Sequence, residues 1–113
     1  DCKISHLRLP KLKKVGCSGF VFNNLQKVYL PSLQTMGCYG FGWCKELQEF
    51  YAEQLKFVHQ YCFYQCVRLQ LINCNLLPEK FACPDQCGEC PVCSGKIGLC
   101  LKRGQQGGKV KIQ

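Results

Sequence analysis

The sequence predicts a mainly β solenoid of short parallel strands with a period of 21 to 22 residues, closed by an irregular cysteine-rich C-terminal cap. The first observation is the recurrence of leucines at a fixed spacing, which is the sequence signature of a solenoid. The second is the density of cysteines, because five of the twelve fall within 18 residues where the repeat has stopped. We therefore expect a solenoid over 1–82, a cysteine-rich cap over 83–100 and a basic, glycine-rich linker or tail over 101–113.

Four units make up the repeat, and the last of them is incomplete. They begin near Ile4, Leu25, Leu47 and Leu69. The second reads LQKVYLPSL and the third LQEFYAEQL, so apolar residues follow the pattern L-x-x-V-x-L-x-x-L. The V-x-L alternation predicts a short strand with one buried face, and the rest of each unit returns to begin the next strand. One unit cannot bury its apolar side alone, whereas stacked units share a continuous core.

Glycines punctuate the return segments at Gly16, Gly19, Gly37 and Gly40, where we expect a tight backbone or a positive φ. A β sandwich of short strands is the rival fold, but strands of a sandwich do not repeat side chain for side chain. The run LxxVxLPxLxxxGxxxFxxCxxL resembles the BspA-type leucine-rich repeat over residues 4–77. His59 stands where that pattern has glycine, which puts the third return turn in question. The resemblance implies a leucine-rich-repeat solenoid in a secreted or cell-surface protein that binds proteins or matrix.

The strand pattern also predicts which side chains face outward. When the V and L of V-x-L face the core, the residue between them and the residue before V face solvent, since side chains alternate. One outward column is then Arg8, Tyr29, Tyr51 and Asn73, and its neighbour is His6, Lys27, Glu49 and Leu71. From these columns we predict the partner-binding residues Arg8, Lys27, Tyr29, Glu49, Tyr51 and Asn73, because tyrosine and arginine dominate binding hot spots. The alternative is that they are ordinary strand residues, tyrosine being favoured in sheets for its packing.

Cysteines within the repeat occupy equivalent positions of successive units. Cys17 matches Cys38, and Cys44 matches Cys66, while Cys74 takes an inward strand position. We interpret Cys44, Cys66 and Cys74 as small buried hydrophobic residues. Disulfides between adjacent units are the alternative, because neighbouring strands lie about 5 Å apart, within reach of a disulfide.

The tail sequence CPDQCGECPVCSGKIGLC holds a second group of cysteines. These disulfide or metal candidates are Cys83, Cys87, Cys90, Cys93 and Cys100. Prolines and glycines make the segment loop-like, so cross-links or metal must stabilise it. Structural zinc and an iron–sulfur cluster are open alternatives, but zinc sites usually have two separated C-x2-C hooks, and the Cys-Pro that closes a typical cluster motif is absent. We favour disulfides and expect no resident cofactor, with zinc as the alternative; the odd fifth cysteine pairs with Cys74 or with a residue beyond Gln113.

Charge and motifs exclude several classes of function. The net charge of +8 divides into +5 over residues 1–36, −2 over 37–94 and +5 over 95–113. Basic ends attract acidic surfaces, but no nucleic-acid-binding pattern accompanies them, so we interpret them as solvated ends. No apolar stretch is long enough to span a membrane, so any membrane contact would need a segment outside this chain. Because the chain begins with Asp1, we expect a mature product or an excerpt of a longer protein.

No catalytic constellation surrounds the two histidines, His6 and His59, and Gly104 to Gly108 lack the ending of a phosphate loop. The sequence therefore predicts no enzyme and no small-molecule substrate. We expect a module that binds a protein or matrix ligand in an extracellular or surface-anchored protein. The alternative is a cytoplasmic scaffold with a small structural zinc knuckle, which would have free thiols and bound zinc.

Overall fold

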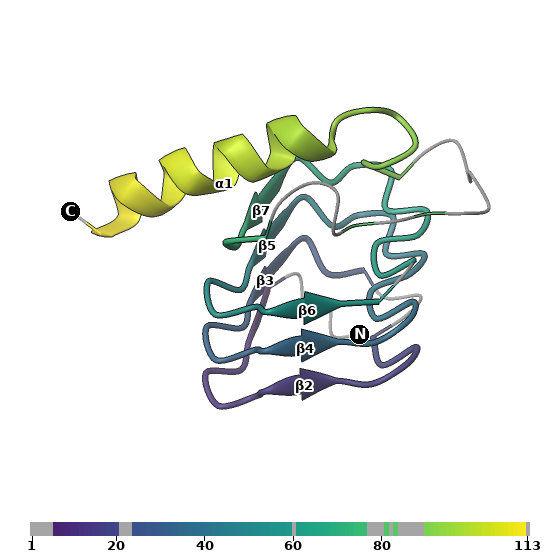
Figure 1. The fold of residues 1–113 in the computed structure, drawn as a ribbon, viewed down its shortest axis with the longest axis horizontal. Coiled ribbons are helices and arrows are strands. Elements are labelled where there is room, and N and C mark those ends of the chain that lie inside the picture. The colour runs from purple at the N-terminus through teal and green to yellow at the C-terminus, as the bar shows by residue number, and fades with distance from the viewer. Residues whose placement is uncertain are drawn as a thin grey trace.

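The computed structural model describes residues 6–20, 24–59, 61–76, 81, 83 and 90–112. Two parallel sheets run side by side along the stack of repeats, and one helix lies across its C-terminal end (Figure 1). The first sheet contains β1 (His6–Arg8), β3 (Lys27–Tyr29), β5 (Glu49–Tyr51) and β7 (Leu71–Asn73). The second contains β2 (Lys14–Val15), β4 (Thr35–Met36) and β6 (Phe57–Val58), and the helix is α1 (Ile97–Ile112).

Strands of the first sheet pair in the order in which the units follow one another, β1-β3-β5-β7, and every pairing is parallel. Equivalent residues of successive units are direct partners, so Val28 pairs with Phe50 and Phe50 with Ile72. These three side chains are fully buried, whereas their strand neighbours are only partly buried. The predicted repeat solenoid of short parallel strands is therefore confirmed, with the predicted alternation of buried and outward positions.

The second sheet, β2-β4-β6, was not predicted from the sequence. Each of its strands has two residues, which is too short for an alternating pattern to be visible. Its buried positions are Val15, Met36 and Val58. Each of the first three units therefore contributes one strand to each sheet, the fourth contributes β7, and the buried residues of both sheets belong to one core cluster.

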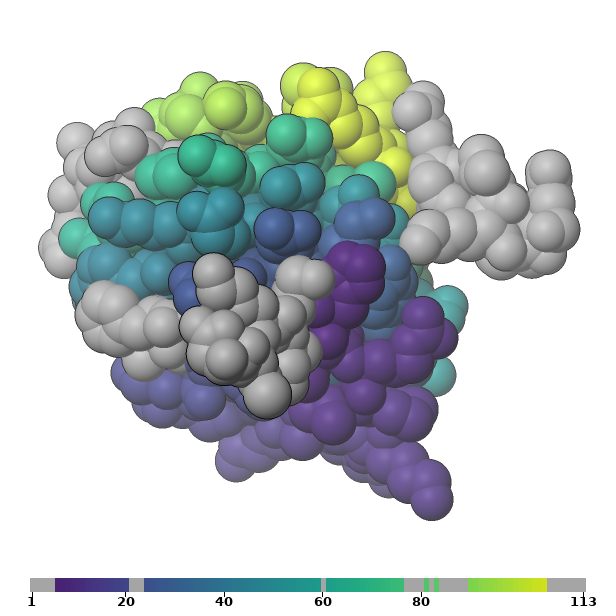
Figure 2. All heavy atoms as spheres, turned by 180° about the vertical axis from the view of Figure 1, so that it is seen from behind, coloured from purple at the N-terminus to yellow at the C-terminus, as the bar shows by residue number. Residues whose placement is uncertain are grey.

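The core consists of columns of equivalent apolar residues. Leu33 and Leu55 are 0% and 3% exposed, and Leu25, Leu47 and Leu69 form a second buried column. Phenylalanines extend this packing, because Phe20 and Phe41 stack with ring centroids 5.1 Å apart. Figure 2 shows the units from behind, following one another from the N-terminal end of the stack toward α1.

The return turns differ from the prediction in where positive φ occurs. The punctuating glycines do not adopt it; it falls at the equivalent positions Ser18, Tyr39 and Tyr61, where φ is 59°, 55° and 65°, and also at Trp43 and Gln65. Glycine serves the close approach of two backbones instead, since a Cβ on Gly37 would lie 2.8 Å from the backbone nitrogen of Cys17.

The third return turn forms even though His59 replaces glycine. Its amide donates to the carbonyl of Met36 at 2.9 Å, as the amide of Gly37 donates to the carbonyl of Val15 at 2.8 Å in the preceding unit. Histidine is tolerated at position 59 because the backbone there forms this hydrogen bond between units without a positive φ.

The segment predicted as a basic, glycine-rich linker or tail, 101–113, is helical up to residue 112, and its helix, α1, begins at Ile97 inside the cysteine-rich cap. Glycines disfavour a helix, but α1 packs along β7, and tertiary packing outweighs local propensity. Cys100 and Leu101 are buried in the core cluster, and a Cβ on Gly104 would overlap the Ile72 carbonyl oxygen. In the part of the chain that the structure describes, no helix has the length and apolar content needed to cross a membrane.

Candidate protein-binding face and cysteine cluster

Three side chains stack on one another across the outer face of the first sheet, one from each of β1, β3 and β5. The guanidinium carbon of Arg8 lies 4.7 Å from the centroid of the Tyr29 ring. The rings of Tyr29 and Tyr51 are 4.8 Å apart and inclined by 7°. Parallel in-register pairing produces this arrangement, because it places equivalent residues directly beside one another. We call Arg8, Tyr29 and Tyr51 the aromatic ladder.

A polar network runs beside the aromatic ladder. The carboxylate of Glu49 accepts a hydrogen bond of 2.6 Å from the hydroxyl of Tyr51 and lies 3.7 Å from the Lys27 ammonium. Burial raises the pKa of Tyr51, and the hydrogen bond to Glu49 and its negative charge raise it further. The phenol is therefore protonated at neutral pH and fixed in orientation.

Asn73 continues the ladder column in register but has a different contact. Its side-chain amide donates to the carbonyl of Gly104 in α1 at 2.8 Å. Of the six predicted partner-binding residues, five therefore meet in the aromatic ladder and its polar network, while Asn73 connects β7 to the helix. The sequence gives no indication of that contact, because no helix was predicted in the tail.

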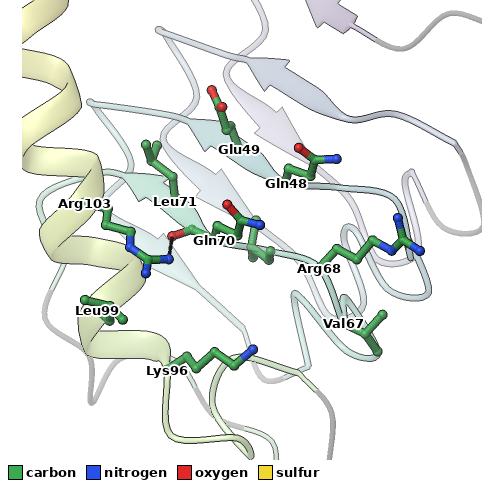
Figure 3. Close-up of a pocket in the computed structure, with 10 residues that line it drawn as sticks. Gln48, Glu49, Val67, Arg68, Gln70, Leu71, Lys96, Leu99 and Arg103 are labelled. Carbon is green, nitrogen blue, oxygen red and sulfur yellow. Dashed lines mark hydrogen bonds between the residues drawn. The ribbon is translucent and has the colours of Figure 1, made fainter.

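A hollow of about 610 Å³ lies where α1 meets the turn before β7 (Figure 3). Lys96, Leu99 and Arg103 line it from the helix side, while Arg68 and Gln70 line it from the strand side. The Arg103 guanidinium donates to the Gln70 carbonyl at 3.4 Å. Glu49 and Leu71 also line the hollow, so it adjoins the second outward column of the sheet.

A group of aromatic residues at the return turns was missed in the sequence. Tyr39 and Tyr61 stack with ring centroids 4.8 Å apart, and Trp43 and Tyr64 pack around them. Three of the four have positive φ, which is uncommon for bulky residues. The available signal was the spacing of 22 between Tyr39 and Tyr61.

The repeat cysteines lie as the buried-thiol interpretation requires. The Cys44 thiol donates to the carbonyl of Phe20 at 3.0 Å, and the Cys66 thiol donates to that of Phe41 at 2.9 Å. Burial raises the pKa of Cys66 well above its usual value and also raises that of Cys74. Cys17, by contrast, is exposed. The thiols of Cys66 and Cys74 are therefore protonated and poorly reactive.

Three tail cysteines come together. The sulfur atoms of Cys83, Cys90 and Cys93 all lie within 4.8 Å of one another, and those of Cys90 and Cys93 are 3.5 Å apart. Cys100 lies elsewhere, with its sulfur 3.5 Å from the Leu69 carbonyl in the core, and Cys87 is outside the described residues. Three thiolates at this separation could hold a metal ion.

Comparison with protein families matches residues 1–81 to the BspA type leucine rich repeat region, described with six copies. Comparisons with curated proteins and with solved structures gave no significant match. Domains of this repeat type are typically non-enzymatic interaction modules. The match covers more than half of the chain, so the chain belongs to the BspA-type leucine-rich-repeat family.

Proposed function

We propose that this chain binds a protein or extracellular-matrix ligand through the outer face of its first sheet, as part of a secreted or surface-anchored protein. The aromatic ladder is the observation that carries the proposal. Stacked tyrosines offer a rigid surface that is apolar on the ring and polar at the hydroxyl, so a partner gains contact area at a small cost in side-chain entropy.

The polar network strengthens this argument, because it holds the ladder in one conformation before a partner arrives. The Glu49 carboxylate accepts a hydrogen bond from Tyr51 and forms an ion pair with Lys27, so both of these partners belong to the same face. Pre-organised side chains lose less freedom on binding, which raises affinity. Arg8 is exposed at one end of the ladder and can contact a carboxylate or a carbonyl of the partner.

The hollow beside α1 extends the proposed face with positive charge. Lys96, Arg68 and Arg103 line it. Glu49 lines it too and Arg68 pairs with Glu46 at 3.4 Å, but the lining side chains keep a net positive charge, which attracts acidic groups. A protein ligand that places an apolar side chain on the tyrosines and an acidic one in the hollow would fit both regions.

The extracellular location is supported by the twelve cysteines and by the surface proteins in which this repeat class is typical. A cytoplasmic scaffold with a zinc knuckle is the second candidate, favoured by the cluster of Cys83, Cys90 and Cys93. Counting disulfides in protein isolated without reductant separates the two, because the extracellular protein should have disulfides among cysteines other than the buried Cys44, Cys66 and Cys74, and the scaffold should have none.

The experiment for the binding face is the double substitution Tyr29→Ala with Tyr51→Ala. Retention of the purified chain on immobilised extracellular-matrix extract is measured by surface plasmon resonance, and folding by circular dichroism. We expect a folded protein whose affinity falls at least about tenfold, since loss of a binding hot spot costs about 2 kcal/mol or more. Phe57→Ala is the matched control, because Phe57 is an exposed aromatic residue on the other sheet. Undiminished binding by a folded double variant, or an equal loss in the control, would contradict the proposal.

A further inference from the structure

The cysteine cluster lies at the junction between the last repeat and the cap. Cys83 and Cys90 are 8% and 2% exposed, and Cys93 is partly exposed. Cys83 and Cys90 border a small hollow together with Phe63 and Phe81, whose rings stack at 6.1 Å. Two of the three sulfurs are therefore largely withdrawn from water, and the third has access to solvent.

The backbone between Cys90 and Lys96 is folded so that the two cysteines of the C-x2-C step lie on the same side. The amide of Ser94 donates to the Cys90 carbonyl at 3.0 Å, and the amide of Lys96 donates to the Pro91 carbonyl at 2.8 Å. Gly95 has a φ of 80°, a conformation that glycine adopts without strain. This turn places both sulfurs close together, 3.5 Å apart.

The sulfur separations match a metal site more closely than a disulfide. A tetrahedral zinc ion with Zn–S bonds of about 2.3 Å places its thiolates about 3.8 Å apart. The separation of 3.5 Å between Cys90 and Cys93 is close to that value, and Cys83 lies within 4.8 Å of both. A disulfide would bring two sulfurs to about 2.05 Å.

We propose that Cys83, Cys90 and Cys93 bind a zinc ion that holds the cysteine-rich cap together against the last repeats. Thiolates are soft ligands and select zinc over magnesium or calcium. Each thiol gives up its proton as it binds, and water would complete a tetrahedral site at the fourth coordination position. Zinc bound here would join Cys83, near the end of the repeats, to the turn that leads into α1, and would stabilise the folded state because the unfolded chain has no preformed site.

The test begins with the full chain, refolded under reductant with zinc and freed of excess metal. We expect about one zinc per chain by elemental analysis, as one tetrahedral site requires. Cobalt in place of zinc should give thiolate-to-cobalt charge-transfer absorption and tetrahedral ligand-field bands. A chelator should lower the thermal midpoint of the wild-type chain.

Variants assign the site. Cys93→Ser should lose the zinc and the chelator effect, whereas Cys93→His should retain zinc, because imidazole is also a zinc ligand. Cys17→Ser is the matched control, an exposed cysteine of the first unit, and should retain the full zinc content. Circular dichroism verifies that each variant is folded.

Several outcomes would overturn the proposal. They are a wild-type chain without zinc, a Cys90–Cys93 disulfide that persists under reductant, absorption typical of an iron–sulfur cluster, and equal loss of zinc in Cys17→Ser. The wild-type measurement decides the question even if Cys93→Ser fails to fold. None of these readouts depends on the proposed binding face.

Discussion

A buried residue of this solenoid stabilises two neighbouring units at once, because its side chain packs on the equivalent side chains of those units. Leu55 illustrates this, since it is 3% exposed in the column that contains Leu33, while the adjacent Lys56 is exposed. Substitution at a column position therefore disturbs two interfaces between units. Substitution at the next residue disturbs neither.

Leu55→Ala should lower the free energy of unfolding by about 2–5 kcal/mol, the usual cost of a buried leucine and of the cavity that it leaves. Lys56→Ala should change that free energy by no more than about 0.5 kcal/mol, as is usual for exposed positions. Urea titration followed by circular dichroism measures both. Equal midpoints for the two variants would show that the assigned register is wrong.

Among the elements, α1 stands apart because it ends the sheet instead of extending it. Its backbone lies directly against β7 at Gly104, the Asn73 side chain of β7 donates a hydrogen bond to the helix, and the Arg103 side chain donates one to Gln70, directly before β7. An edge strand presents unpaired backbone groups that can recruit another chain, and covering them with a helix is one way to prevent this. Close approach of the helix depends on a residue without a side chain at position 104.

Two glycine substitutions in α1 test that dependence. Gly104→Ala should destabilise the protein by about 1–3 kcal/mol, because the new Cβ would overlap the Ile72 carbonyl and the helix would have to move. Gly98→Ala is the matched control; no atom lies within 4 Å of its added Cβ, and alanine favours the helix by up to about 1 kcal/mol. Thermal midpoints should therefore shift in opposite directions. A Gly104→Ala midpoint as high as that of Gly98→Ala would mean that the helix does not pack on β7 as described.

The elements differ in how well the sequence predicts them. The first sheet is predictable because a step of the form apolar-x-apolar recurs with a fixed period and because in-register stacking follows from that period. The second sheet is not, since two-residue strands carry no periodicity. The helix escapes prediction for another reason, because glycine disfavours a helix and Gly104 is explained only by its contact with Ile72 of β7, which is distant in the sequence.

The two candidate sites also differ in how well the sequence predicts them. The aromatic ladder could be predicted because alternation along a strand and the repeat period together fix the neighbours of Tyr29. The proximity of Cys83 to Cys90 and Cys93 could not be predicted, nor could the separate position of Cys100 in the core. These cysteines lie in an irregular part of the chain, which has no repeat period from which distances could be inferred.

At the scale of the whole molecule, the two ends of the stack differ in burial. In the first unit Leu9, Leu12 and Phe20 are only partly buried, whereas the equivalent Leu30 and Leu33 of the second unit are fully buried. A repeat is stabilised by its neighbours, so an end unit lacks part of its packing. At the C-terminal end the cap supplies what a further unit would have provided, since Cys100 and Leu101 enter the core cluster beside Leu69 and Ile72.

Removing the cap should therefore affect the solubility of the chain more than its repeat structure. Truncation after Leu77 removes α1 and the cysteine cluster, which exposes Leu69, Ile72 and the edge of β7 together. An apolar layer beside an open strand edge is a site for association between chains.

We expect the truncated chain to form oligomers or aggregates at concentrations where the full chain is monodisperse, as measured by size-exclusion chromatography with light scattering. Its circular dichroism should retain the strand signal. A truncated chain that stays monodisperse and unfolds as cooperatively as the full chain would show that the last repeat needs no cover.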